Sequence, residues 1–274
     1  MISFSGVWVK IAHVEPVVSA FYRVFFGGMI LFALALFRGE IRWRGIRHLG
    51  WESLCGGVFA LDLAFYHHAI TTVGPGLGTI LSNFQVFILA GFGMLFLRER
   101  PRRIYLAAVP LAVAGLFLIV GLEWKALDAT YKTGILFGLA AAFFYAAYIL
   151  VLRRLQSEPD AGAPLSVLAV VSMITAIVLA ADVHRSGDGF AIPDIESWMS
   201  LAALGLFSQV LGWILIASAL PRMRASLAGL ILLLQPALSF VWDVAFFDRP
   251  TSAANWLGVA LTLTAIYLGS FRRR

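Results

Sequence analysis

Long apolar runs separated by short polar segments make up almost the whole chain. A helix rises about 1.5 Å per residue, so about 20 residues cross the hydrocarbon core of a bilayer. By this criterion the pattern predicts nine spanning helices, at residues 16–37, 50–70, 75–97, 103–122, 132–153, 163–182, 197–219, 225–247 and 251–271. Residues 1–12 are also apolar, but they rise only about 18 Å. We expect them to be the second part of an incomplete first helix, which makes ten helices in all.

The chain has too little polar surface for a soluble protein. Of its 274 residues 61% are hydrophobic and 13% are charged, whereas soluble domains carry about 25% charged residues. Because a bilayer offers no water to backbone groups, runs of this length should be helices. We therefore expect an all-α polytopic membrane protein. The single cysteine, Cys55, cannot form an internal disulfide, and no cysteine–histidine pattern indicates a metal site or another cofactor.

The basic residues lie mainly in the short loops at one end of the predicted helices. If residues 1–12 are counted as the first helix, fifteen of the 21 basic residues follow the second, fourth, sixth, eighth or tenth helix: Arg38, Arg42, Arg44, Arg47, Arg98, Arg100, Arg102, Arg103, Arg153, Arg154, Arg222, Arg224, Arg272, Arg273 and Arg274. The opposite loops hold five, Lys10, Lys125, Lys132, Arg185 and Arg249. Since positive loops stay in the cytoplasm, we expect a multi-pass protein of the bacterial inner (plasma) membrane with a cytoplasmic C-terminus. The net charge of +6 then reflects orientation in the bilayer and does not indicate a nucleic-acid partner.

The two halves of the sequence resemble each other. Residues 78–101 align with residues 228–250, so that Gln85 matches Gln235 and Pro101 matches Pro250 after a one-residue gap. Five helices per half is an odd number, so the second half should be inserted upside down. We therefore expect two inverted five-helix repeats, 1–125 and 126–274, an arrangement typical of transporters that hold substrate near the bilayer midplane.

Two stretches resemble a known family. "GPGLGTILSNFQVF" (74–87) with "LRER" (97–100), and "LLQPALSFVWDVAFFDRP" (233–250) with "WLGVALTLTAIYLGS" (256–270), are similar to EamA-type members of the drug/metabolite transporter superfamily. The resemblance covers nearly the whole chain. It implies ten helices and the export or facilitated passage of amino acids or related metabolites. Val86 stands where the second half has Pro236, so only one of the two paired helices carries the proline typical of the motif.

Two charged residues fall deep within predicted spans. Arg23 and Asp62 lie about 10 and about 12 Å below the outer ends of adjacent helices, which makes them natural partners. A charge in hydrocarbon costs several kcal/mol, so each needs a partner or a function. One interpretation is a buried pair that fixes helix packing. The other is that Arg23 binds a substrate carboxylate, while Asp62 orients it or binds an amine.

Amide and aromatic side chains at similar depth predict a polar central cavity. The amides are Asn83, Gln85, Gln209 and Gln235, and the aromatic candidates are Tyr66, Tyr145, Tyr148 and Trp213. Tyr66 shares a helix face with Asp62, four residues earlier, and Tyr145 and Tyr148 share a face otherwise lined by small residues. Hydrogen bonding between helices could explain any single amide, and packing any single ring. Together they favour a substrate site.

Two adjacent histidines follow Tyr66 near the outer end of their predicted span. His67 and His68 are best explained as interfacial residues with polar tips in water, and a titrating gate is the alternative. The resulting prediction is a secondary transporter of small polar metabolites, most simply amino acids, that works by alternating access. Coupling to protons through Asp62 or His67, and uncoupled passage, both stay open, as does the oligomeric state.

The rival class is an intramembrane enzyme, a hydrolase or acyltransferase that uses Asp62 with His67 or His68. Such an enzyme needs a nucleophile or a metal constellation, and neither HExxH nor GxSxG occurs in the sequence. No nucleotide-binding P-loop occurs either. The expected partners are therefore a small-molecule substrate and the lipid bilayer.

Overall fold

The computed structural model describes residues 2–41, 43–73, 75–120, 129–157, 164–248 and 250–270, and within them every regular element is a helix. The chain divides into two compact units. Unit 1 comprises residues 1–64 and 147–222, and unit 2 comprises residues 65–146 and 223–274. Each unit therefore takes segments from both sequence halves. Two long helices, α3 (Ile46–Val73) and α7 (Ala129–Ser157), run through both units.

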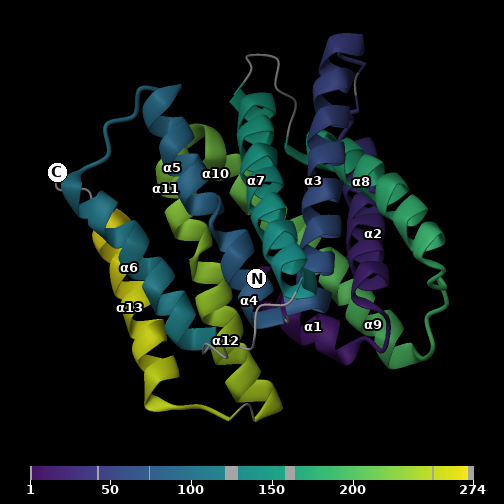
Figure 1. Cartoon of the computed structure of the whole chain (residues 1–274). Coiled ribbons are helices and arrows are strands. Elements are labelled where there is room, and N and C mark those ends of the chain that lie inside the picture. The colour runs from purple at the N-terminus through teal and green to yellow at the C-terminus, as the bar shows by residue number, and fades with distance from the viewer. Residues whose placement is uncertain are drawn as a thin grey trace. The chain divides into compact units, whose positions relative to one another are not determined.

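Unit 1 is built around α2 and α8, which lie side by side (Figure 1). Besides parts of α3 and α7, it contains η1 (Ile2–Phe4), α1 (Ser5–Ile11), α2 (Pro16–Phe37), α8 (Pro164–Ser186), α9 (Ile195–Ala203), the π-helix η2 (Leu204–Gly212), α10 (Trp213–Ala219) and η3 (Leu220–Arg222). Helix α2 begins with proline at its first position, where no N–H is needed, and is followed by Gly39 at φ 63°. The predicted and observed bounds of α2 are the same.

Adjacent glycines on α2 bring two other helices of unit 1 close to it. A Cβ atom on Gly27 would lie 2.5 Å from Cβ and Cγ of Gln209 on η2. A Cβ atom on Gly28 would lie 2.9 Å from the sulfur of Met173 and 3.2 Å from Cβ of Ser172, both on α8. The glycine pair therefore lets η2 and α8 both approach α2. Small residues serve this purpose in membrane helices, where close backbone approach supplies packing.

Unit 2 has α6 and α13 packed along each other (Figure 1). Its own helices are α4 (Pro75–Asn83), α5 (Gln85–Leu95), α6 (Arg103–Val120), α11 (Ala225–Leu232), α12 (Leu234–Phe247) and α13 (Ala253–Ser270). A Cβ atom on Gly258 would lie 2.5 Å from the carbonyl oxygen of Gly115, so the two backbones meet at this glycine pair. Asn255 fixes the register, because its amide donates to the carbonyl oxygens of Leu118 and Ile119 at 3.0 and 2.9 Å.

Two helical runs of unit 2 are interrupted. The first breaks at Phe84, between α4 and α5, and the second at Leu233, between α11 and α12. Pro236 explains the second break, because its ring removes one helical hydrogen bond and crowds the preceding turn. At the first break Asn83 Nδ2 donates to the carbonyl oxygen of Thr79 at 2.8 Å, so a side chain competes for a helix carbonyl. The breaks fall at positions that the sequence repeat aligns within about a residue.

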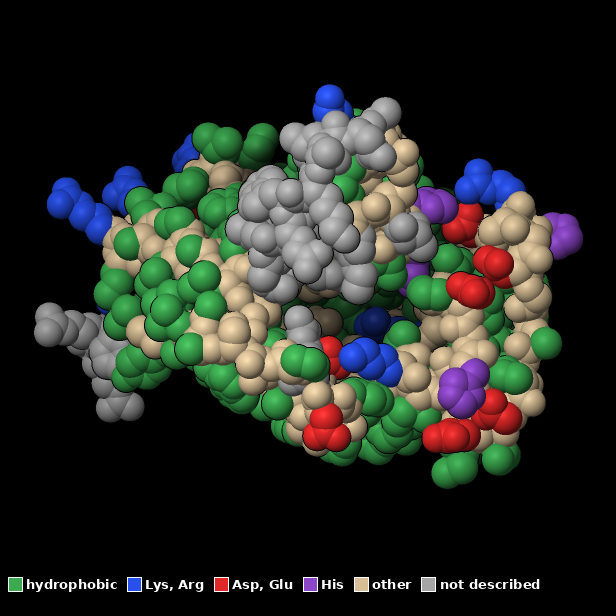
Figure 2. Space-filling view, turned by 60° about the horizontal axis from the view of Figure 1, so that its bottom comes forward, with side chains coloured by type: hydrophobic (Ala, Val, Ile, Leu, Met, Phe, Trp, Pro, Cys, Tyr) green, Lys and Arg blue, Asp and Glu red, His purple; other side chains and the backbone are tan. Residues whose placement is uncertain are grey.

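Six segments are long and apolar enough to cross a membrane by length and composition. Among the described residues they are Pro16–Phe37, Gly78–Leu95, Thr130–Ser157, Pro164–Ser186, Ile195–Arg222 and Ala225–Phe247, and three shorter apolar helices cover Ile2–Ile11, Arg103–Ile119 and Ala253–Gly269. Hydrophobic side chains also cover much of the surface that Figure 2 shows. The all-helical membrane protein is therefore confirmed. Ten transmembrane helices and the inversion of the repeat remain predictions.

An ion pair joins the segment between α1 and α2 to the start of α9. Asp194 caps α9 by accepting from the backbone N–H of Ser197 at 2.7 Å, and its second oxygen lies 3.0 Å from His13 Nδ1. The hydrogen bond to Asp194 raises the pKa of His13, and the same bond lowers the pKa of Asp194 to about 2. Both side chains are well exposed, so solvent screens the pair.

This pair predicts a small pH dependence of stability. Folding raises the pKa of His13. The contribution of this residue to the free energy of unfolding is therefore complete below about pH 6.5 and is lost as pH rises through the folded-state pKa. We expect the wild type to melt at a higher temperature than His13→Gln at pH 5.5, and the difference to shrink at pH 8.5. Thermal unfolding in detergent measures this. A difference that stays constant with pH contradicts it.

Candidate functional site

A chain of hydrogen bonds crosses the centre of unit 1. Arg23 on α2 donates from Nε to Oε1 of Gln209 on η2 at 3.3 Å. The amide of Gln209 in turn donates to the hydroxyl of Ser172 on α8 at 2.9 Å. Gln209 and Ser172 are fully buried, and Arg23 is partly buried. Three helices of unit 1 are thus linked by polar groups.

Gln209 lies in an unusual backbone segment. The π-helix η2 covers the nine residues Leu204–Gly212, whereas π-helices normally occur as single turns, frequently at functional sites. The wider turn changes where side chains point, and Gln209 is directed toward Arg23 by this segment. Gly205 helps, because a Cβ atom there would lie 3.1 Å from the backbone nitrogen of Gly27. The polar chain therefore depends on a close approach of two backbones.

Asp62 lies on α3 and is 7% exposed. Its charge interacts electrostatically with Arg23, but among the described residues no hydrogen bond or ion-pair contact joins it to another side chain. The predicted Arg23–Asp62 pair therefore stays a prediction: the two charges interact, while Nε of Arg23 donates to Gln209. A buried carboxylate in a membrane helix indicates a functional site by default.

Three aromatic rings pack together beside this carboxylate. Phe59 stacks on Tyr148 with ring centroids 4.2 Å apart, and Trp213 meets Tyr148 and Phe59 edge-on at 4.8 and 5.6 Å. The rings come from α3, α7 and α10. Phe59 is three residues before Asp62, so the two are neighbours on the surface of α3. The arrangement places aromatic faces one helical turn from a carboxylate.

Several buried polar atoms of unit 1 are unsatisfied. Within the described part of the chain, Trp213 Nε1, Ser19 Oγ and Ser208 Oγ have no hydrogen-bond partner. Ser19 lies one turn before Arg23 on α2, and Ser208 precedes Gln209 on η2. A buried donor without a partner costs about 1–3 kcal/mol, so such atoms need an explanation. A bound ligand or water would satisfy them.

The other predicted residues belong to unit 2 and make local contacts there. The hydroxyls of Tyr66 and Thr79 share a hydrogen bond of 2.9 Å, and Gln85 donates to the carbonyl oxygen of Gly229 at 3.4 Å. Asn83 bonds within its own helix, as described above. Tyr145 and Gln235 are partly buried, on α7 and α12. The ten predicted residues thus fall into two sets of five, and the polar central cavity remains a prediction.

The two histidines differ from each other. His68 is exposed and its ring lies 5.5 Å from that of Phe137, as expected at an interface. His67 is 8% exposed and packs 5.8 Å from the ring of Tyr66, so its predicted exposure to water is wrong. Among the described residues, no group of three or more His, Cys, Asp and Glu side chains could hold a metal ion.

The sequence analysis missed two residues that the structure brings to this site. Ser172 is the acceptor at the end of the Arg23–Gln209 chain, and nothing in the apolar run around it separates it from other small residues. Phe59 could have been found, because it shares a helix surface with Asp62 at a spacing of three. The π-helix left no signal in the sequence.

The chain is similar in sequence to known membrane transporters. Residues 1–121 and 132–271 match the EamA-like transporter family. The uncharacterized transporter YwfM of Bacillus subtilis (strain 168) is 25% identical over 255 residues, 92% of this chain and 83% of that protein. The probable amino-acid metabolite efflux pump of Escherichia coli (strain K12) is 23% identical over 222 residues, 78% of this chain and 73% of that protein.

A solved crystal structure shares the fold. It is 20% identical in sequence, has a TM-score of 0.82, and matches over 98% of this chain and 92% of its own. The family match spans both sequence halves and leaves out few residues between and after them. The chain therefore belongs to the EamA-like transporter family.

Proposed function

We propose that this membrane transporter moves small polar metabolites, amino acids or related compounds, by alternating access. The observation that carries the proposal is the buried Arg23–Gln209–Ser172 chain beside the carboxylate of Asp62. Buried charges and amides are costly in a membrane protein and mark substrate pathways. An intramembrane enzyme that uses Asp62 with the histidines is disfavoured, because the family consists of transporters.

The chemistry of these groups suits a zwitterion. The guanidinium of Arg23 can bind a carboxylate with two parallel hydrogen bonds, and Asp62 can accept from an amine. The rings of Phe59, Tyr148 and Trp213 are buried against one another and form apolar packing one helical turn from Asp62. One relative is named as a probable amino-acid metabolite efflux pump, which supports the same substrate class.

Alternating access is supported by the interrupted helices of unit 2. Transporters built from inverted repeats typically have broken helices at corresponding positions of the two repeats. The interruptions at Phe84 and Leu233 lie within about a residue of each other when residues 78–101 are aligned with residues 228–250, and both residues keep right-handed helical backbone angles. The helix ends that follow them also match, since Arg98 and Asp248 both adopt left-handed backbone conformations, with φ 53° and 46°. These features favour repeats 1–125 and 126–274.

Ligand-dependent thermostability tests this proposal. The purified chain would be melted in detergent with a panel of amino acids, their decarboxylated amines and their amino-free carboxylates. We expect a zwitterion to raise the melting temperature of the wild type and to leave Gln209→Ala unshifted. Stabilisation by no compound in the panel, or equal stabilisation of both proteins, would count against a substrate site at Gln209. Uptake with and without a pH gradient then separates proton coupling through Asp62 or His67 from uncoupled passage.

Orientation in the membrane is tested by two matched serine positions. Ser157 is the last residue of α7, on the side predicted to be rich in arginine. Ser186 is the last residue of α8, the next helix, and is predicted to lie on the other side of the membrane. Both side chains are exposed. In a Cys55→Ala background, we expect Ser186→Cys to react with a membrane-impermeant maleimide in intact cells. Ser157→Cys should react only after permeabilisation. The reverse labelling contradicts an inner-membrane protein with its C-terminus in the cytoplasm.

A further inference from the structure

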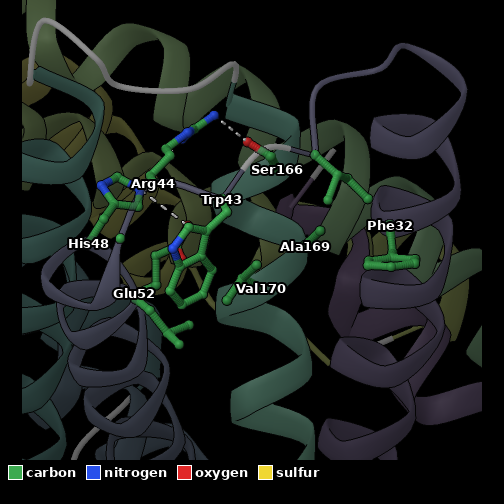
Figure 3. Close-up of a pocket in the computed structure, with 11 residues that line it drawn as sticks. Phe32, Trp43, Arg44, His48, Glu52, Ser166, Ala169 and Val170 are labelled. Carbon is green, nitrogen blue, oxygen red and sulfur yellow. Dashed lines mark hydrogen bonds and ion pairs between the residues drawn. The ribbon is translucent and has the colours of Figure 1, made fainter.

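A second polar site lies in unit 1, apart from the Arg23–Gln209–Ser172 chain. A cavity of about 320 Å³ is bounded by the end of α2, the segment before α3, the first turns of α3 and the start of α8. Its apolar walls include Phe32, Ile41, Trp43, Leu49 and Val170, and its polar lining is Arg44, His48, Glu52 and Ser166. In Figure 3 Arg44 reaches toward Ser166, with His48 and Glu52 nearby and Phe32 on another side of the cavity.

The three ionisable groups are spaced four residues apart. Arg44 Nη2 donates to the hydroxyl of Ser166 at 3.1 Å, and Arg44 Nη1 lies 3.4 Å from His48 Nε2. The same His48 nitrogen lies 3.4 Å from Glu52 Oε1. Opposite charges therefore line one cavity, with an imidazole between them.

The imidazole cannot satisfy both neighbours at once. If His48 Nε2 is unprotonated it can accept from Arg44, and it then has no hydrogen to give Glu52. If it is protonated it can donate to Glu52, and it then cannot accept from Arg44. One charged group is thus always left without its histidine bond. Arg44 also has five N–H donors, more than its contacts with Ser166 and His48 use.

We propose that this cavity binds the headgroup of a phospholipid that carries a primary amine. Arg44 and Ser166 would hold the phosphate, because a guanidinium binds phosphate oxygens through two parallel hydrogen bonds. Glu52 would accept from the ammonium group. A phosphate and a primary ammonium group joined by two carbons offer oxygen acceptors to Arg44 and N–H donors to Glu52. A quaternary amine has the same charge but no N–H to donate, and a glycerol headgroup has no ammonium group.

The surroundings of the cavity favour a lipid over a free headgroup. Large apolar side chains at the same end of unit 1 are exposed, among them Phe37 at 89%, Trp43 at 75% and Ile46 at 76%. They would lie along acyl chains that leave the cavity. Residue 50 begins the predicted span, so Glu52 lies about 3 Å inside it and Arg44 just outside, at headgroup depth. Tryptophan is typical of that depth.

Melting temperature in detergent with added lipid tests the proposal. The lipids share one pair of acyl chains and differ in headgroup: ethanolamine, choline, which is its N-trimethylated form, and glycerol. We expect ethanolamine lipid to stabilise the wild type most, with an apparent affinity about tenfold above that of choline lipid. Equal stabilisation by the three lipids overturns the proposal. So does equal stabilisation by soluble phosphoethanolamine, because the site would then take a free headgroup.

Variants assign the two charges separately. Arg44→Ala should weaken the binding of ethanolamine and glycerol lipids alike, by about tenfold. Glu52→Gln should abolish only the preference for ethanolamine lipid. Arg47→Ala is the matched control, since Arg47 is exposed, lies three residues after Arg44 in the first turn of α3 and does not line the cavity. The proposal is wrong if Arg44→Ala binds both lipids as tightly as the wild type, or if Glu52→Gln keeps the preference for ethanolamine lipid. If either variant fails to fold, the comparison of lipids on the wild type still decides.

Discussion

Replacing Arg23 by alanine is expected to lower transport at least about tenfold. The substitution removes a charge-assisted hydrogen bond to Gln209, worth about 1.5–3 kcal/mol, and leaves the charge of Asp62 without its nearest compensation. Arg23→Lys should also transport poorly, because an ammonium group keeps the charge but loses the planar fork that binds a carboxylate. Initial rates of uptake into proteoliposomes, at equal protein content, measure both.

The double variant Arg23→Ala/Asp62→Ala separates a structural role from a substrate-binding role. It removes both charges together, so a pair that only fixes packing should leave a folded and active protein. We expect it to melt no lower than Arg23→Ala, because the charge of Asp62 is removed as well, and to show weak transport with a raised KM. Full activity in the double variant would remove both residues from the site and leave Gln209 as its best candidate.

Gly27→Ala is expected to damage both stability and transport. Its new Cβ atom would lie 2.5 Å from Cβ and Cγ of Gln209 and 3.2 Å from the carbonyl oxygen of Gly205. Overpacking of this kind costs about 1–3 kcal/mol, which lowers the melting temperature by roughly 5 °C. Because the clash pushes Gln209 away from Arg23, transport should fall as well.

Two other glycines provide controls for this substitution. Gly28→Ala should cost less, because its Cβ atom would mainly meet the flexible sulfur of Met173, at 2.9 Å. Gly57→Ala on α3 meets nothing within 4 Å, so the higher helix propensity of alanine should leave it as stable as the wild type or more so. Equal melting temperatures for Gly27→Ala and Gly57→Ala would contradict the close α2–η2 contact.

The helices could be predicted because their cause lies in the sequence. An apolar run of about 20 residues has few alternatives in a membrane, and α2 has the predicted bounds. The break at Leu233 also has a visible cause in Pro236. The break at Phe84 does not, because it accompanies a contact of the Asn83 side chain that apolar patterning does not encode. The π-helix around Gln209 is equally invisible, since its sequence reads as an ordinary apolar helix.

The candidate site was predicted as a set of residues but not as a set of contacts. Depth along a helix selected Arg23, Asp62 and Gln209 as residues inside the spans, and the structure buries Asp62 and Gln209 and partly buries Arg23. Depth gives no rotation about the helix axis, so the Arg23–Gln209 bond was not foreseen and the Arg23–Asp62 pair stays a prediction. The same limitation explains His67. Its depth along the helix predicted a side chain near water, whereas packing against neighbouring residues buries it.

Solute counterflow in proteoliposomes tests the central claim most directly. Vesicles with the purified wild-type chain would be loaded with one unlabelled amino acid and diluted into a trace of the same labelled compound. The account predicts transient accumulation of label for at least one amino acid or related metabolite, and strongly reduced accumulation with Gln209→Ala. Label at the level of protein-free vesicles for every compound in the panel, or full counterflow by Gln209→Ala, would contradict it.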